Sequence, residues 1–391
     1  MSGTLPTQVK LLESIRDVPQ AAWDALVDEQ AAPFLEWGWL DALESSGSVH
    51  PATGWRPRHL TLWRGHHLVA AAPAYLKDDS HGEFVFDWSW ATAAERVGLR
   101  YYPKLIVAAP LTPATGRRIL VAAGEDRAAR TAELMRAAVE YARSEGLSSL
   151  HVLFPTEEES TVLEHEGFGI RHGVQYHFLN EGYRTFDDVL ARFTSKRRNQ
   201  IRRERRATTE HHIALRTLRG DALAEVDPDE VYRLYTSTVD KFVWGRRYLT
   251  PDFFSRVLER LRHRVELVQA VRAGKVIAGA FNVVGPEALY GRYWGCFDEV
   301  PFLHFDVCVY QGIEETVTRG LKRFEPGAGG EHKLVRGFFP RITYSAHWIF
   351  HGPLDRAVRE FLGHERRAIA QGLPSWRSET GFKSPIGAAG A

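Results

Sequence analysis

Hydrophobic positions in the first half of the chain alternate between helix and strand spacing. Over 128–145 apolar residues recur at helical intervals, with Leu134, Ala138 and Tyr141 on one face and Gly146 after the end. Other segments are shorter. Strands are expected at 9–15, 58–63, 68–76, 84–88, 150–154 and 174–179, and helices at 20–27, 34–44 and 162–167. This order predicts a twisted mixed sheet with helices packed on it.

The second half begins with a helix start signal. Thr185 and Asp188 have the spacing of a capping box and precede apolar residues at helical intervals. Three strands then follow closely at 265–272, 276–284 and 288–297, and the turn between the first two predicts a hairpin. Further helices are expected at 229–240, 251–262, 305–320 and 354–371, and further strands at 323–325 and 344–350.

The two halves share one order of elements, although no residue-level repeat connects them. A chain of 391 residues has room for two domains of about 190 residues each. We expect an N-terminal domain over 1–180, a C-terminal domain with the active site over 181–374, and a flexible tail over 375–391. The expected fold class is mixed α/β, each domain a twisted mixed sheet flanked by helices.

Composition and charge narrow the class of protein. The 50 basic and 49 acidic residues nearly cancel, so any electrostatic partner must bind a local patch. The first ten residues lack a signal-peptide pattern, and the apolar runs are too short to cross a bilayer. Only Cys296 and Cys308 are present, so at most one disulfide can form. We therefore expect a cytoplasmic protein without a membrane span.

The strand at 290–296 is the most informative segment for chemistry. Alternation predicts that Tyr290, Arg292, Trp294 and Cys296 share one face, with Tyr293 on the other. Burying an arginine among aromatic rings is costly unless it is paired. The pattern favours a clamp for a carboxylate or phosphate, while a structural bridge from Arg292 to a carboxylate of the next helix remains the alternative.

A glycine-rich loop follows the expected strand at 323–325. Gly330 is followed by Glu331, His332 and Lys333, and loops at the carboxyl ends of strands are where α/β sheets bind ligands. Glu331 or His332 would serve as a general base if its pKa lies near the working pH, and Lys333 would hold a phosphate or carboxylate. Composition alone favours a solvated polar turn over a catalytic loop.

Two further segments carry candidate binding residues. His304 stands at the start of a helix after the aromatic strand, where free backbone N–H groups attract anions, although a core or capping histidine is the simpler interpretation. The stretch 196–206 contains seven basic residues against one acid, Glu204. Lys196, Arg197 and Arg198 begin it, and it would bind phosphates of RNA or coenzyme A, or form a solvated face.

Several functional classes are excluded by missing motifs. The sequence contains no nucleotide-binding P-loop, no H-E-x-x-H zinc motif and no G-x-S-x-G nucleophile motif. Its 17 histidines show no metal-ligand spacing, so we expect no metal site.

Six ordered strings resemble the Fem-like family of N-acyltransferases, also labelled peptidoglycan-biosynthesis-like. The strings cover most of the chain and lie at 82–88 (GEFVFDW), 101–105 (YYPKL), 290–295 (YGRYWG), 300–305 (VPFLHF), 330–334 (GEHKL) and 344–348 (YSAHW). The resemblance implies tandem GNAT domains and relatedness to enzymes that move an amino acid from aminoacyl-tRNA to an amine of a cell-wall precursor.

The resemblance leaves the acyl donor open between acyl-coenzyme A and aminoacyl-tRNA. The acetyltransferase pyrophosphate loop has no convincing copy, and no paired heptads indicate the helical arm of the tRNA-using enzymes. At 241–245 the sequence departs from the expected lysine directly before Trp-Gly, which removes the expected role of Lys241, whereas Trp244 still fits as a substrate-binding residue.

Together these patterns predict an N-acyltransferase that transfers by direct attack of an amine on an acyl or aminoacyl donor. We expect no tightly bound cofactor, and a small-molecule or peptide amine as acceptor. Trp88, Tyr293 and Trp294 would wall the acceptor site, and Tyr293 joins Glu331 and His332 as an expected catalytic residue. Backbone N–H groups of the strand at 276–284 would stabilise the oxyanion. The alternative is a non-catalytic or RNA-binding module that uses the basic helix at 196–206.

Overall fold

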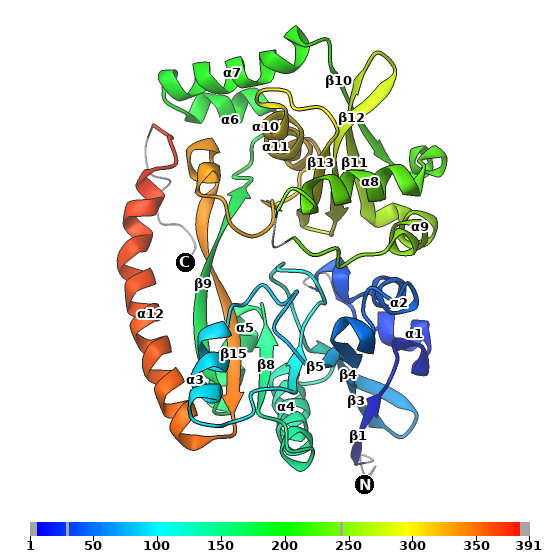
Figure 1. Ribbon diagram of the computed structural model, residues 1–391, viewed down its shortest axis with the longest axis vertical. Coiled ribbons are helices and arrows are strands. Elements are labelled where there is room, and N and C mark those ends of the chain that lie inside the picture. Colours follow the sequence, from blue (N-terminus) through cyan, green and yellow to red (C-terminus); the bar gives the residue numbers. More distant parts are fainter. Residues whose placement is uncertain (1–5, 29–30, 243–244, 384–391) are drawn as a thin grey trace. The chain divides into compact units, whose positions relative to one another are not determined.

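The computed structural model describes residues 6–28, 31–242 and 245–383, whose helices and strands are labelled in Figure 1. The chain folds into two compact units. Unit 1 comprises Met1–Gly173 and Ile342–Ile369, and unit 2 comprises Val174–Arg341 and Ala370–Ala391. Neither unit is therefore a continuous piece of the chain.

Unit 1 contains two sets of paired strands. In the first, strands pair antiparallel in the order β1-β3-β4-β7; in the second, the order is β15-β8-β6-β5-β2, and only β6 and β8 are parallel. The bounds are β1 (Thr7–Leu12), β2 (Trp55–Pro57), β3 (His59–Arg64), β4 (His67–Ala72), β5 (Ala74–Lys77), β6 (Lys104–Val107), β7 (Leu120–Val121), β8 (Ser149–Leu153) and β15 (Phe339–Ile349).

The helices of unit 1 bury apolar faces against these strands. Asp126 caps the longest of its complete helices by accepting a hydrogen bond from the backbone N–H of Ala129, and Leu134 and Ala138 on its inner face enter the main core. A second core forms around Trp90 and Leu362. The bounds are α1 (Gln20–Asp24), α2 (Trp37–Ser45), α3 (Trp88–Arg96), α4 (Arg127–Ser144), α5 (Glu157–His165) and α12 (Gly352–Ser378), whose last turns count with unit 2.

The strands of unit 2 have the order β10-β11-β12-β13-β14-β9, and only β13 and β14 are parallel. The expected hairpin is confirmed, because β11 pairs with β12 through the turn at Ala273 and Gly274. The bounds are β9 (Gly169–Leu179), β10 (Ala214–Arg219), β11 (Val265–Arg272), β12 (Lys275–Val284), β13 (Ala288–Cys296) and β14 (Arg323–Glu325).

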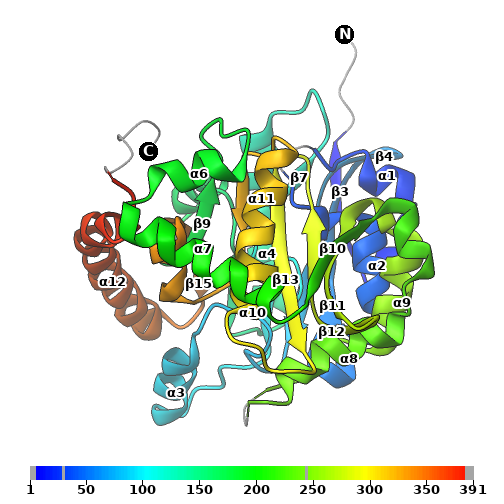
Figure 2. The ribbon, with the colours of Figure 1, turned by 90° about the horizontal axis from the view of Figure 1, so that it is seen from above.

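Helices of unit 2 pack closely on its strands. Figure 2 shows α11 lying along β13, and Gly312 brings α11 so near that an added Cβ would lie 2.4 Å from the ring of Phe324. The bounds are α6 (Phe186–Arg192), α7 (Ser195–Glu210), α8 (Pro228–Val239), α9 (Pro251–Arg260), α10 (Leu303–Phe305) and α11 (Gln311–Thr318), with a π-helical turn (Asp306–Tyr310) before α11 and a 3₁₀ helix η7 (Glu331–Arg336).

The division into units differs from the continuous ranges expected from the sequence. Segment 342–369 returns to unit 1 because Ala346 and Trp348 pack into its main core and Val358 into its second core. The expected flexible tail is also wrong up to residue 383. Its first residues complete α12, and Phe382 forms a β-bridge with Phe193.

The strand expected at 84–88 is a loop followed by the start of α3. Gly82 and Phe84 have positive φ angles of 78° and 59°, which turn the chain out of an extended conformation. Trp88 then opens α3. The alternation of apolar residues here does not mark a buried strand face, since Phe86 is 67% exposed.

Candidate functional site

Strand β13 presents its aromatic residues on both faces of the sheet of unit 2. Ala280 of β12 lies opposite Trp294, and Val283 lies opposite Tyr290. Residues opposite one another share a face, and residues three apart on a strand do not, so Tyr290 and Trp294 point to opposite faces. The expected common face is wrong because the register shifts at a bulge, with Arg292 as the extra residue.

The bulge places Arg292 and Tyr293 side by side. The Arg292 guanidinium carbon lies 5.4 Å from the centroid of the Tyr293 ring. Tyr293 packs with Tyr235 at 5.1 Å and Phe281 at 5.9 Å between ring centroids, on the face covered by α8 and α9. Tyr293 is therefore part of an aromatic cluster of unit 2, and Arg292 covers its ring.

Tyr290 belongs to a buried polar group beside β14. Its hydroxyl accepts a hydrogen bond of 3.3 Å from Arg323, whose Nε lies 2.7 Å from Glu325. Strand pairing between β13 and β14 covers only Ala288–Tyr290, and Pro326 follows directly. Because proline cannot donate to a strand ladder, the parallel pairing ends here. Strands β13 and β14 therefore separate after Tyr290.

Trp294, His304 and His332 come together on the other face of β13. The His304 ring centroid lies 5.2 Å from that of Trp294 and 6.1 Å from that of His332. Burial and the nearby charges of His332, Lys333 and Arg336 lower the pKa of His304 to about 4. Burial, Lys333 and Arg336 also lower the pKa of His332, which is more exposed. Both imidazoles are therefore neutral at pH 7 and offer a lone pair.

Lys333 follows His332 in η7, is buried and binds the glycine-rich loop. Its Nζ donates to the backbone oxygens of Gly327 at 2.9 Å and Gly329 at 2.7 Å. Burial lowers the pKa of Lys333 to about 8. Two of the three N–H groups of the Lys333 ammonium therefore hold the loop after β14, and the third N–H group is left to donate elsewhere.

A buried ion pair fixes η7 to α7. The Arg336 guanidinium lies 3.0 Å from Glu204 and 3.6 Å from the ring centroid of Phe305, and the Tyr310 hydroxyl also donates to Glu204. Glu204 and Arg336 are both buried, so removal of either partner would leave an uncompensated charge. This pair holds His332 at its position next to α10.

Part of the predicted site lies elsewhere or outside the described residues. Trp244 and the side chain of Glu331 lie outside what the structure describes. Trp88 belongs to unit 1, where it is 41% exposed and stacks on His81 at 4.8 Å. Strand β12, whose backbone N–H groups are the expected oxyanion donors, pairs with β11 along one edge and with β13 along the other, and both pairings shift register at a bulge.

The first turns of the basic helix show mostly local contacts. Lys196 is exposed, the Arg197 guanidinium donates to Gln200 at 3.0 Å, and the Arg198 guanidinium donates to Ser195 at 3.4 Å. Arg197 and Arg198 are half-buried, and none of the three predicted phosphate ligands contacts the histidine pair within the described residues.

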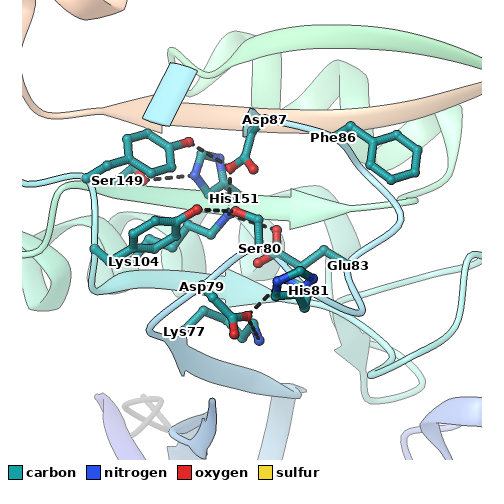
Figure 3. Close-up of polar contacts among 12 residues, drawn as sticks. Lys77, Asp79, Ser80, His81, Glu83, Phe86, Asp87, Lys104, Ser149 and His151 are labelled. Atoms are coloured by element: carbon teal, nitrogen blue, oxygen red, sulfur yellow. Dashed lines mark hydrogen bonds and ion pairs between the residues drawn. The ribbon is translucent and has the colours of Figure 1, made fainter. Parts of the chain in front are cut away.

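Unit 1 contains a polar network that the sequence did not reveal as a site. Figure 3 shows Lys104, at the start of β6, pointing toward Ser80, Glu83 and Asp87 of the preceding loop. The Lys104 Nζ lies 2.8 Å from the first two and 2.5 Å from Asp87. Tyr101 donates a further hydrogen bond of 2.7 Å to Asp87. All three N–H bonds of this buried lysine thus order the loop that precedes α3.

The two carboxyl groups of this network titrate differently. Burial raises the pKa of Glu83 to about 7, and neighbouring Asp87 adds to that rise. Burial alone would raise the pKa of Asp87 as well, but Lys104 outweighs it and holds that pKa at about 2. Oε1 of Glu83 and Oδ1 of Asp87 are buried and accept no hydrogen bond from the described part of the chain.

A chain of four side chains crosses β8 and β15 next to this network. His151 and His347 share a hydrogen bond of 2.7 Å between their Nδ1 atoms. Each Nε2 lies 2.8 Å from a serine hydroxyl, Ser149 for His151 and Ser345 for His347. Burial is the first cause that lowers the pKa of both histidines, to about 3 for His151. Two neutral tautomers satisfy every atom of this chain.

Sequence reasoning missed this network for a physical reason. Glu83, Asp87 and Lys104 lie within two of the strings that carry the family resemblance, yet nothing in their spacing joins a loop to the start of a strand. The signal that was available is Lys104 itself, a charged residue that opens an otherwise apolar four-residue strand. A lysine in such a strand requires buried partners.

Two negative findings concern the described residues only. Within them, no group of three or more His, Cys, Asp or Glu side chains could hold a metal ion. No helix among them combines the length and apolarity needed to span a bilayer.

Solved structures similar to this chain share its fold at low sequence identity. The crystal structure of FemX is 12% identical, with a TM-score of 0.53 over 88% of this chain and 98% of that one. A tandem GNAT protein from the clavulanic acid biosynthesis pathway is 12% identical over 88% and 98%, at a TM-score of 0.47. L-PGS from Bacillus licheniformis is 10% identical over 86% and 99%, at 0.48. The expected fold class, mixed α/β with helix-flanked mixed sheets, is confirmed.

Sequence comparison gives the family. No curated protein matches the chain. The family model named FemAB_like, described as peptidoglycan biosynthesis/recognition, matches residues 14–384. The match spans both units and includes the histidine pair of unit 2 and the Lys104 network of unit 1. The chain therefore belongs to the FemAB-like family.

Proposed function

We propose that this protein is an N-acyltransferase that moves an acyl or aminoacyl group from a thioester or an aminoacyl-tRNA to an amine acceptor of peptidoglycan metabolism. Membership of the FemAB-like family supports the reaction class. One observation carries the location: Trp294, His304, His332 and Lys333 converge beside β13 in unit 2. This is the part of unit 2 in which neutral bases and a lysine of lowered pKa lie together.

The reaction needs a group that takes a proton from the attacking amine. The amine nitrogen forms a bond to the acyl carbon, the carbonyl oxygen becomes an oxyanion, and the thiolate or ribose oxygen leaves as the carbonyl re-forms. In this proposal His332 takes the proton from the amine nitrogen and returns it to the leaving group. Its neutral state at pH 7 suits this role, and its exposure admits an acceptor.

His304 and Lys333 have supporting roles in the proposal. The buried ring of His304 fixes the position of His332 and contacts Trp294, which would line the acceptor site. The ammonium of Lys333 uses two N–H groups on the glycine-rich loop, and the third would stabilise the oxyanion. Tyr290 and Arg292 lie on the face of β13 opposite Trp294, so the predicted carboxylate or phosphate clamp is not part of this site, and Glu331 stays a predicted second base.

The test is a transfer assay on the full chain with two donors. The acceptor is a peptidoglycan stem peptide with a free lysine amine, and the donors are radiolabelled acetyl-coenzyme A and a tRNA pool charged with radiolabelled amino acids. His332→Ala is expected to reduce kcat by about 10²-fold or more. His67→Ala replaces an exposed histidine of unit 1 and serves as the control. Wild-type rates for His332→Ala would remove this histidine from the mechanism.

A second candidate function is RNA binding without catalysis. The observation that favours it is the row of exposed basic side chains on α7, among them Lys196, Arg202 and Arg206. Labelled product from the charged tRNA pool would decide for the transferase. Tight RNA binding with no product from either donor would decide for the binding module.

A further inference from the structure

A groove of about 590 Å³ lies between α6, α7 and α11 in unit 2, away from the histidine pair. Three arginines of α7 line it, Arg202, Arg205 and Arg206, together with Asn199. Its other wall is formed by α6, with Phe186 and Leu190 at the apolar base. Within the basic stretch 196–206 the sequence singled out Lys196, Arg197 and Arg198 as phosphate ligands, whereas the groove is lined by later arginines of the same stretch.

The register of α7 explains why the arginines face the groove. Ile201, Glu204 and Thr208 form the buried face of the helix. Arg202 and Arg206 lie four residues apart, so they stand one above the other on an exposed face. The buried pair between Glu204 and Arg336 fixes the rotation of α7 about its axis. The two exposed guanidinium groups are therefore held side by side by the core of unit 2.

The three arginines differ in their partners. Arg205 is occupied, because it binds Glu314 at 2.8 Å and Asp306 at 3.2 Å and covers the ring of Phe186 at 4.7 Å. Arg202 and Arg206 make no hydrogen bond or ion pair within the described parts of the chain. The groove thus offers the exposed guanidinium groups of Arg202 and Arg206 to a ligand, whereas the charge of Arg205 is already neutralised.

The charge of the lining selects the class of ligand. Three arginines against Asp187 and Glu314 give the groove a net charge of +1, and Glu314 is already bound to Arg205. Arginine forks match the oxygens of phosphate in geometry, and an asparagine adds a neutral donor. A carboxylate ligand would use one fork, whereas two stacked forks suit two phosphates or a diphosphate.

We propose that this groove is a phosphate-binding site in which Arg202 and Arg206 bind successive phosphates of a nucleotide-bearing ligand. The phosphates belong either to an RNA backbone or to a free nucleotide such as coenzyme A. The site stands apart from the proposed transfer chemistry, since it rests on the groove and its unpaired arginines alone. In this proposal the phosphates contact the middle turns of α7, not its first turn, where Lys196, Arg197 and Arg198 lie.

Binding by the full-length protein tests the site without any transfer reaction. The probes are a fluorescent RNA hairpin, followed by anisotropy, and coenzyme A, followed by calorimetry, each over a salt series. The double variant Arg202→Ala/Arg206→Ala is expected to lower the affinity for whichever probe the wild-type protein binds by tenfold or more. It should also reduce the slope of log affinity against log salt by about two for RNA. Which probe binds identifies the source of the phosphates.

Arg203→Ala provides the matched control on the same helix. Arg203 is equally exposed but does not line the groove. If Arg203→Ala lowers the affinity as much as the double variant does, the groove is not the binding site. Binding would then come from the diffuse positive charge of α7. Absence of binding by both probes would overturn it as well. Unchanged thermal unfolding of the variants confirms that their fold is intact, and either failure leaves the transfer assay unaffected.

Discussion

At the scale of single residues, Lys104 bonds to two carboxyl groups of the buried network in Figure 3, Glu83 and Asp87. Its ammonium is fully buried and balances Glu83 and Asp87. Lys104→Met removes that charge and leaves two buried carboxyl groups without their ammonium partner, so the free energy of unfolding should fall by about 3–5 kcal/mol. Urea denaturation of the variant measures the loss.

The control for this prediction is Lys275→Met, which replaces an exposed lysine in the β11–β12 hairpin. It should change the free energy of unfolding by less than about 0.5 kcal/mol. If Lys104→Met does not fold, the triple variant Lys104→Met/Glu83→Gln/Asp87→Asn removes the stranded charges and should recover part of the stability. Equal stability of Lys104→Met and wild type would contradict the assigned role.

Glu83 gives stability a specific pH dependence. Its pKa is about 7 in the folded state against 4.5 as the ordinary value, so the folded state binds the proton more tightly. The stabilisation that comes from this proton is fully present below pH 4.5 and is lost as the pH rises to 7. Over that range the free energy of unfolding falls by at most about 1.4 kcal/mol per pH unit. Asp87 has the opposite sign, because its pKa of about 2 adds stability that is lost only as the pH falls below 3.8.

The variant Glu83→Gln isolates this effect. Urea titrations of wild type and variant between pH 4.5 and 8 give two curves of stability against pH, and their difference removes every group that both proteins share. The free energy of unfolding of Glu83→Gln minus that of wild type should increase as the pH rises through that range. Parallel curves would show that Glu83 does not titrate in this window.

At the scale of elements, two glycines predict opposite effects of the same substitution. An added Cβ at Gly295 of β13 would lie 1.8 Å from the backbone oxygen of Leu234, so Gly295→Ala must displace α8. We expect a loss of about 1–3 kcal/mol. Gly363 lies within α12, where a Cβ meets only an ordinary contact of 3.7 Å with Arg367. Gly363→Ala should therefore stabilise the protein by about 0.5–1 kcal/mol. Thermal unfolding compares the two variants, and a loss at Gly363 would contradict the contact argument.

The same scale shows what could be predicted from the sequence. Helix periodicity over 128–145 and the hairpin at 265–284 were readable because short-range patterns determine them. The bulge at Arg292 was not, since it depends on how β12 and β13 pair. Without the bulge, simple alternation placed Tyr290 and Trp294 on one face. The Lys104 network was equally invisible, because its partners approach only when the loop before α3 folds.

At the scale of the whole molecule, near-neutral charge makes local patches decisive. The totals of 50 basic and 49 acidic residues leave no general attraction for a polyanion. Salt dependence of ligand binding must therefore come from clusters such as α7. The histidine pair and the arginine groove lie in unit 2, and the Lys104 network lies in unit 1. The sequence predicted catalytic residues in the second half only and named Trp88 alone from the first, because the partners of Lys104 come from a separate segment of the chain.

The discontinuous units predict how the chain can be divided. A fragment of residues 1–180 lacks β15, which pairs with β8, and lacks Ala346 and Val358 from the cores of unit 1. It should not unfold cooperatively. Gly173 and Thr343 face one another, with an added Cβ at Gly173 only 2.7 Å from the threonine hydroxyl. Joining 1–173 to 342–369 through a short glycine–serine linker should therefore restore a cooperative transition in circular dichroism. Cooperative unfolding of fragment 1–180 alone would show that segment 342–369 is dispensable for unit 1.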